Sequence, residues 1–214
     1  KGPINGLSVD VEAWFQVGAF EDVIARDNWE GLADRVERNV MEILDLFDEA
    51  EVKATFFTLG WVAGRHPALM RRIAEAGHEI ASDGWDHARV HTMGQQQFGA
   101  DIARARKTIE DATGVSVTGY RAPSFSIDHR TPWAYVELAE QGYTYSSSVA
   151  PVTHDHYGWR EAPRFAFRPL PWSDLLEIPA GRSGRSTGAK GARRCSISTR
   201  GRSIRASRAW LAHL

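Results

Sequence analysis

The stretch Leu7-Ser8-Val9-Asp10-Val11-Glu12 lies near the start of the 214-residue chain and decides the fold. Its apolar positions predict a buried strand, and Asp10 and Glu12 place two carboxylates at the end of that strand. Loops that leave the carboxyl ends of parallel strands converge on one crevice, where enzymes commonly hold catalytic groups or metals. Side chains two residues apart on a strand point to the same face. Asp10 and Glu12 are therefore expected to share one pocket.

Alternating helix and strand patterns continue to about residue 180. Apolar residues recur at helical spacing over about residues 31–49, and the β-branched and aromatic run over residues 53–59 predicts a buried strand. The same patterns predict further helices over about residues 67–77, 98–114 and 131–142, and further strands over residues 79–82, 115–120, 143–149 and 175–178. Repeated β-α-β units imply parallel strands covered by helices, hence an α/β fold. Periodicity leaves open whether the sheet is open or closes as a barrel.

Composition separates a domain over residues 1–180 from a basic tail over residues 181–214. The chain as a whole has a net charge of −1, yet the tail contains nine basic residues and no acidic residue. The tail is rich in Gly, Ser and Arg and lacks apolar periodicity, which predicts disorder. Nucleic-acid binding is not expected, because no aromatic residue is interleaved with these charges before Trp210.

Three further features limit the class of protein and its location. No apolar run approaches the roughly 18 residues that cross a bilayer, so no transmembrane segment is expected. The opening Lys1-Gly2-Pro3 does not resemble a signal peptide, and a cytoplasmic location is expected. The single cysteine, Cys195, excludes an internal disulfide framework and a zinc site built on cysteines.

Two later strand ends also carry reactive side chains. Asp83-Gly84-Trp85-Asp86-His87 directly follows the strand at residues 79–82 and offers a carboxylate and an imidazole four residues apart. Together with Glu12, Asp83 and His87 would make the open three-ligand set of a catalytic metal site. Arg121 follows the next predicted strand, where its guanidinium can orient the Asp10 carboxylate. Reactive groups at three successive strand ends favour one shared active site.

The ordered motifs Ser8–Glu12, Asp83–His87 and Arg121–Ser126 resemble those of the polysaccharide deacetylases, the NodB homology domain of carbohydrate esterase family 4. The chain is most similar to the bacterial subgroup associated with exosortase/PEP-CTERM exopolysaccharide systems. That likeness rests on three further segments, Trp14–Val17, Ala54–Trp61 and Tyr145–Val149. The resemblance covers roughly residues 5–180.

The resemblance implies a distorted, incomplete (β/α) barrel. It also implies metal-dependent removal of acetyl groups from an N-acetylated polysaccharide or oligosaccharide. By resemblance, Asp10 takes the position of the catalytic base and Arg121 that of the arginine that orients it. The backbone N–H of Ser124 takes the position of the oxyanion donor, and Trp85 is a cleft-edge aromatic residue expected to contact the sugar.

The resemblance places Glu12, Asp83 and His87 at the metal-ligand positions. Asp83 departs from the family pattern, which has histidine at this point. An aspartate still binds zinc, but a set of two carboxylates and one imidazole is harder and carries more negative charge. Zinc is the metal expected first, and manganese or cobalt stays open.

A second departure concerns the general acid. The family's last motif is a strand-end histidine well beyond Ile178, whereas the family-like sequence stops near Ala180. Residues 181–214 are therefore expected to replace the closing strands and helices, through a frame change or a divergent tail, and to leave the domain incomplete. The sequence assigns none of His91, His154 and His156 as a substitute acid.

Two other functions stay open at this point. The missing acid, together with the aromatic residues Trp14 and Trp85, is compatible with a non-catalytic carbohydrate-binding relic of the same fold. A metal-free glycosidase would use Asp10 and Glu12 as an acid/base pair. Side chains two apart on one strand usually lie too close to act on both faces of a sugar ring, which disfavours the glycosidase.

Overall fold

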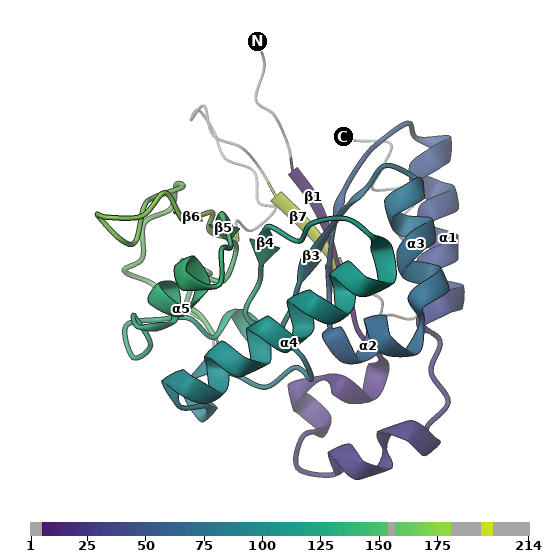
Figure 1. Ribbon diagram of the computed structural model, residues 1–214, viewed down its shortest axis with the longest axis horizontal. Helices are drawn as coiled ribbons and strands as arrows, with labels where there is room; N and C mark the ends of the chain where they lie inside the picture. Colours follow the sequence, from purple (N-terminus) through teal and green to yellow (C-terminus); the bar gives the residue numbers. More distant parts are fainter. Residues whose placement is uncertain (1–5, 154–156, 181–193, 199–214) are drawn as a thin grey trace.

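The computed structural model describes residues 6–153, 157–180 and 194–198, and it shows one parallel sheet with helices packed around it (Figure 1). The strands follow the order β6-β5-β4-β3-β2-β1-β7, and every neighbouring pair is parallel. Their bounds are β1 Gly6–Val11, β2 Thr55–Thr58, β3 Glu79–Ser82, β4 Gly119–Tyr120, β5 Tyr145–Ser146, β6 Leu176–Glu177 and β7 Arg194–Ser198. Because β6 and β7 do not pair with each other in this order, the curled sheet is an incomplete barrel.

In the residues that the structure describes, five α-helices connect the strands. Their bounds are α1 Val36–Glu49, α2 Gly60–Arg65, α3 Pro67–Glu75, α4 Gln95–Thr113 and α5 Ala134–Glu140. Short 3-10 helices lie in the loops, namely η1 Trp14–Gln16, η2 Gly18–Phe20, η3 Arg26–Gly31, η4 Val90–Thr92 and η5 Pro123–Phe125. In the described part of the chain, none of these helices is both long and apolar enough to span a membrane.

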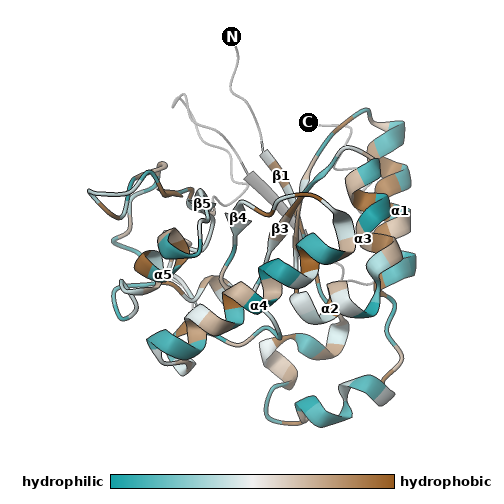
Figure 2. Ribbon diagram, in the orientation of Figure 1, coloured by the Kyte–Doolittle hydropathy of each residue, from teal (hydrophilic) through white to brown (hydrophobic). Residues whose placement is uncertain are grey.

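The helices form where apolar residues recur on one face. In α1, Val40, Ile43 and Phe47 are buried at helical spacing, and polar residues lie between them. Figure 2 shows the resulting two-sided character, with brown apolar and teal polar positions on the same helix. Helix α4 ends at Gly114, whose φ of 73° is left-handed and suits a residue without a side chain.

The strand register brings the reactive strand ends together. Val11 at the end of β1 is aligned with Thr58 of β2, which is aligned with Ser82 of β3. Ser82 is in turn aligned with Tyr120 of β4. The residues that follow these strands, Glu12, Asp83 and Arg121, therefore leave the sheet at one edge. The segment with η1–η3 lies at this edge, below the sheet in Figure 1.

The structure departs from the sequence-based expectations in four places. The helix expected over about residues 31–49 begins only at Val36, after the 3-10 helix η3. Helix α2 was not predicted, because six residues are too short for a helical period to show. Strands β4, β5 and β6 are only two residues long, since the flanking residues bend into loops. Residues 194–198, for which disorder is predicted, form β7 beside β1. The rest of the predicted disordered tail lies outside the described residues.

Candidate active site

Asp10 and Arg121 form an ion pair at the carboxyl edge of the sheet. A terminal guanidinium nitrogen of Arg121 donates to Oδ1 of Asp10 across a sequence separation of 111 residues. The Arg121 side chain is 3% exposed and that of Asp10 is 17% exposed. The expected contact between these two residues is confirmed. Since Asp10 keeps some exposure while its partner is buried, its carboxylate can still meet a molecule that enters from solvent.

Arg121 is held by partners that the sequence did not reveal. Its second terminal nitrogen donates to Oγ of Ser8 at 3.1 Å, and its Nε donates to the carbonyl oxygen of Ser147 at 3.3 Å. Its guanidinium carbon lies 3.8 Å from the ring centroid of Phe57, a cation–π contact. Ser8 could have been found from its position two residues before Asp10, on the same face of β1. Ser147 and Phe57 have no such local signal.

Glu12 and His87 are in direct contact. Nε2 of His87 lies 3.1 Å from Oε2 of Glu12, and both side chains are buried. Two ligands of a tetrahedral ion with bonds of 2.0–2.1 Å lie about 3.3 Å apart. The spacing of this pair therefore suits a hydrogen bond and also suits two ligands of one divalent ion.

Asp83 is the third predicted ligand and leaves the sheet at the same edge. Its N–H donates to the carbonyl oxygen of Thr58 at 2.9 Å, and its side chain is buried. Only β2 separates the strand that ends before Asp83 from the strand that ends before Glu12. Within the described ranges, no three His, Cys, Asp or Glu side chains are already arranged as a metal cluster. The donor types of the three side chains suit a divalent ion, and the Glu12–His87 spacing is compatible with two ligands of one ion, so the metal site stays a prediction.

The loop from Asp83 to His87 is tied to α2. The N–H of Gly60 donates to the carbonyl oxygen of Gly84 at 2.9 Å, and the N–H of Trp61 donates to that of Trp85 at 3.0 Å. Gly84 has a φ of 75°, a left-handed conformation that favours glycine. These two hydrogen bonds fix the backbone between the two predicted ligands of this loop.

Trp85 packs against helices as well as facing the loop. The guanidinium carbon of Arg104 lies 3.4 Å from its ring centroid, so one face of the indole is covered. A Cβ added to Gly60 would lie 2.6 Å from Cε3 of Trp85, which shows how closely the ring edge meets α2. These contacts give Trp85 a structural role, and its contact with a sugar stays a prediction.

Strained backbone gathers at the predicted site. Among the described residues with a side chain beyond Cα, four have positive φ, and three of them are His87, Ser124 and Phe125. Ser124 has φ 54° and ψ 28°, and Phe125 follows with φ 50°. Such conformations cost of order 1–3 kcal/mol each and cluster at functional sites. At Ser124, the predicted oxyanion donor, the backbone therefore departs from regular helical geometry.

An aromatic pair lies beside the Ser124 turn. The rings of Phe125 and Tyr157 are 5.7 Å apart at an interplanar angle of 45°. The guanidinium carbon of Arg121 lies 5.5 Å from the Phe125 ring. Tyr157 is 36% exposed. The site edge therefore presents an aromatic surface next to the Asp10–Arg121 pair.

Three other described histidines, His66, His78 and His91, have partners away from the Asp10–Arg121 pair. His66 contacts Asp34 at 3.2 Å, and Nδ1 of His78 accepts the N–H of Ala54 at 3.1 Å. His91 lies 3.5 Å from a guanidinium nitrogen of Arg130, and burial lowers its pKa. His154 and His156 lie outside the described residues.

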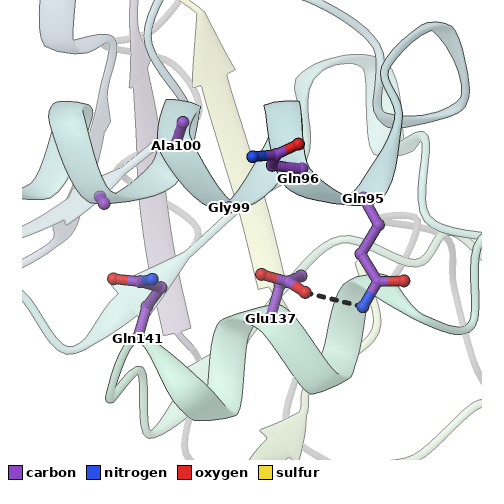
Figure 3. A pocket seen from close by; sticks show the side chains of 7 residues that line it. Gln95, Gln96, Gly99, Ala100, Glu137 and Gln141 are labelled. Atoms are coloured by element: carbon purple, nitrogen blue, oxygen red, sulfur yellow. Dashed lines mark hydrogen bonds between the residues drawn. The ribbon is translucent and has the colours of Figure 1, made fainter.

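A surface groove between α4 and α5 is separate from these residues (Figure 3). Its volume is about 560 Å³, and a hydrogen bond of 2.8 Å from Gln95 to Glu137 crosses it. It is lined by Gln95, Gln96, Gly99, Ala100, Ala103, Glu137 and Gln141. None of the predicted site residues lines the groove.

Comparison with known proteins gives consistent matches. The family model described as polysaccharide deacetylase matches residues 27–145, more than half of the chain. The peptidoglycan-N-acetylglucosamine deacetylase PgdA of Listeria monocytogenes is 36% identical over 81 residues. That alignment covers 38% of this chain and 17% of the Listeria protein, so the chain spans only a small part of that relative's length.

Solved structures show the same fold. A Mycobacterium smegmatis protein, provisionally assigned as a polysaccharide deacetylase, matches with a TM-score of 0.71 and 22% identity, over 99% of this chain and 86% of its own. A family 4 carbohydrate esterase from Streptomyces lividans, solved in complex with acetate, matches with a TM-score of 0.52 and 20% identity. The second match covers 68% of this chain and 62% of the esterase. The expected incomplete (β/α) barrel is confirmed.

Proposed function

This chain belongs to the polysaccharide deacetylase family, and from that premise we propose that it is a metal-dependent hydrolase that removes N-acetyl groups from a polysaccharide or glycan. The observation that carries the proposal is the buried Arg121 guanidinium on Asp10, at the sheet edge where Glu12 and His87 touch. Metal-dependent amide hydrolysis requires a base, a cation that orients the base, and a compact set of oxygen and nitrogen donors that can hold the metal.

Asp10 acts as the general base. Its carboxylate accepts the proton of the water that attacks the acetyl carbonyl, and it is exposed enough to reach that water. Arg121 fixes the direction of the carboxylate, and Ser8 and Ser147 fix Arg121 in turn. The Arg121 guanidinium is buried and donates hydrogen bonds from several of its nitrogens. Its own position is therefore fixed, and this in turn restricts the orientation of the Asp10 carboxylate.

Glu12, Asp83 and His87 would hold the metal. A bound divalent ion supplies Lewis acidity, which polarises the acetyl carbonyl and makes bound water more acidic. Zinc is proposed first, and the two carboxylates also suit manganese or cobalt. The contact between Glu12 and His87 supports this assignment, since it already brings an oxygen donor and a nitrogen donor together.

The backbone N–H of Ser124 is the proposed donor to the oxyanion. Backbone N–H groups stabilise a tetrahedral oxyanion when they are held in place before the reaction. The left-handed conformation of Ser124 and Phe125 supports this role, because strain of that kind is maintained where function requires it.

The proposed substrate is an N-acetylated polysaccharide or oligosaccharide, with a bacterial exopolysaccharide as the expected source. Relatives named for peptidoglycan and chitin deacetylation support an N-acetylglucosamine polymer. Phe125 and Tyr157 offer an aromatic surface next to Arg121, and aromatic side chains are common in the walls of ligand sites.

A non-catalytic carbohydrate-binding protein is the second candidate. The observation that favours it is that His66, His78 and His91, within the described ranges, have partners away from the Asp10–Arg121 pair. Each of these three is engaged by a partner of its own, which does not favour it as the acid that protonates the leaving amine.

Acetate release from N-acetylglucosamine pentamer by zinc-loaded protein separates the two candidates. Stoichiometric or catalytic release that requires the metal is expected for the hydrolase. Binding of the pentamer with no acetate released over hours would favour the non-catalytic candidate.

A further inference from the structure

Helix α4, which packs against α2, also contacts the Asp83–His87 loop. Oδ2 of Asp101, in the second turn of α4, accepts the N–H of Trp85 at 3.0 Å. The guanidinium of Arg104, three residues further along α4, lies over the Trp85 ring at 3.4 Å. Residues three apart lie on one face of a helix, so a single face of α4 holds both the backbone and the ring of Trp85.

The loop is thereby hydrogen-bonded to two helices. The α2 amides donate to the carbonyl oxygens of Gly84 and Trp85, and Asp101 accepts the amide of Trp85. A Cβ added to Gly84 would lie 3.1 Å from Oδ2 of Asp101, so the carboxylate packs tightly against this turn. The proposed ligand Asp83 directly precedes the held dipeptide Gly84-Trp85. The proposed ligand His87 lies two residues after Trp85.

We propose that Asp101 is a positioning residue for the Asp83–His87 loop and sets the affinity of the site for its metal. The inference rests on the proposed function and extends it to a residue that touches neither the metal nor the substrate. Hydrogen bonds one step beyond the ligands orient them, and their loss typically weakens metal affinity by 10- to 100-fold.

The energetic cost of Asp101 supports a functional role. Burial raises the pKa of Asp101 to about 6, which means that the folded protein resists the charged form. The hydrogen bond to the loop amide is one compensation for this cost. The Trp85 amide and the cations of Arg104 and Arg26 offset part of the cost, and the charge of Asp86 adds to it.

Asp111 provides a matched control on the same helix. It is exposed, and its carboxylate pairs with Lys107 at 2.8 Å, one turn along α4. Asp111→Ala also removes an aspartate carboxylate from α4, but it leaves Asp101 in place as the acceptor of the Trp85 amide. Asp101→Asn is the conservative variant, because its amide oxygen can still accept that N–H.

Two measurements on the full chain test the proposal. Zinc alone is titrated into metal-free protein, and amide hydrogen exchange is measured over residues 83–87. Asp101→Ala is expected to weaken zinc binding by 10- to 100-fold and to speed amide exchange in the loop. The zinc affinity of Asp101→Asn is expected to stay within about threefold of that of the parent. Asp111→Ala is expected to match the parent in both measurements.

The outcomes separate this inference from the proposed function. Unchanged loop exchange in Asp101→Ala would overturn the inference, and so would an unchanged zinc affinity. Faster loop exchange together with no zinc binding by the parent chain would support the anchoring and contradict the proposed metal site. If the zinc affinity of Asp101→Asn fell as far as that of Asp101→Ala, the hydrogen bond that residue 101 accepts would not explain the loss of affinity. The inference would then be wrong.

Discussion

Asp10 illustrates how one residue combines two requirements. As the proposed base it must reach solvent, and as an oriented group it must be fixed by a buried partner. The pairing with Arg121 meets both, because the guanidinium is buried while the carboxylate keeps 17% of its side-chain surface exposed. The Ser8 hydroxyl on the same strand adds a second hydrogen bond to the same guanidinium.

Replacing Asp10 by Asn tests the base. The change keeps the volume and removes the proton acceptor, so acetate release is expected to fall by about 10²–10⁴-fold. Zinc affinity should change little, since Asp10 is not a proposed ligand. Asp45→Asn on the exposed surface of α1 is the control and should keep full activity. Full activity in Asp10→Asn would rule out this residue as the base.

The raised pKa of Asp101 predicts a dependence of stability on pH. The folded chain holds the Asp101 proton up to about pH 6, whereas the unfolded chain releases it near the usual 3.8. Folding therefore takes up a proton between these values, and the free energy of unfolding falls as pH rises through this window. The groups that face Asp101 are Trp85 N–H, Asp86, Arg26, Arg104, Tyr120 and Tyr143.

Asp101→Asn should remove this fall, because an amide does not titrate. Relative to the variant, the parent is expected to lose about 2 kcal/mol of unfolding free energy between pH 4 and pH 6.5. Urea unfolding of metal-free protein across this range measures the difference. Parallel curves for parent and variant would show that Asp101 has an ordinary pKa.

At the scale of elements, strand ends position the site and short loops shape it. β1, β2 and β3 end in register, so the residues that follow them leave at one edge. The loop after β3 then has to reverse within a few residues, which it does through the left-handed Gly84. The helices α2 and α4 both form hydrogen bonds with that reversal.

Gly84→Ala should weaken this loop. The substitution places a methyl group 3.1 Å from Oδ2 of Asp101 and forces a left-handed φ on alanine, for which about 1–2 kcal/mol of lost stability is expected. Gly31→Ala is the matched control, because a Cβ there meets no atom within 4 Å. Thermal unfolding of both variants measures the difference. Equal melting temperatures would show that the turn tolerates a side chain.

At the scale of the whole molecule, the site joins segments from most of the described chain. Its residues come from β1, from the loops after β1 and β3, and from the turn after β4. A ligand shared by these segments binds the folded chain and not the unfolded one. Metal binding is therefore expected to stabilise the entire fold.

Zinc at 100 times its dissociation constant should add about 2.7 kcal/mol to the free energy of unfolding. His87→Ala is expected to abolish this gain, because it removes the nitrogen ligand that touches Glu12. His91→Ala, which removes a histidine paired with Arg130, should keep the gain. Calorimetric melts with and without zinc measure both. A gain retained in His87→Ala and lost in His91→Ala would move the site to His91.

Much of the architecture could be predicted because its signals are local. The strand at residues 79–82 is confirmed at both ends, and the expected α/β barrel is confirmed. Helix α2 and strand β7 could not be predicted, since one is too short for a period and the other lies in a basic segment without helical or strand repeats long enough to recognise.

The sequence by itself determined which residues stand at strand ends, because apolar periodicity and turn residues act over a few positions of the chain. That was enough to place Asp10, Glu12, Asp83, His87 and Arg121 at one edge of a parallel sheet. Only the tertiary structure decided which of them touch. Arg121 meets Asp10 across 111 residues, and Asp101 meets the Trp85 amide from another helix. A periodic pattern shows that a face is buried but not what buries it, and that choice depends on the packing of the whole chain.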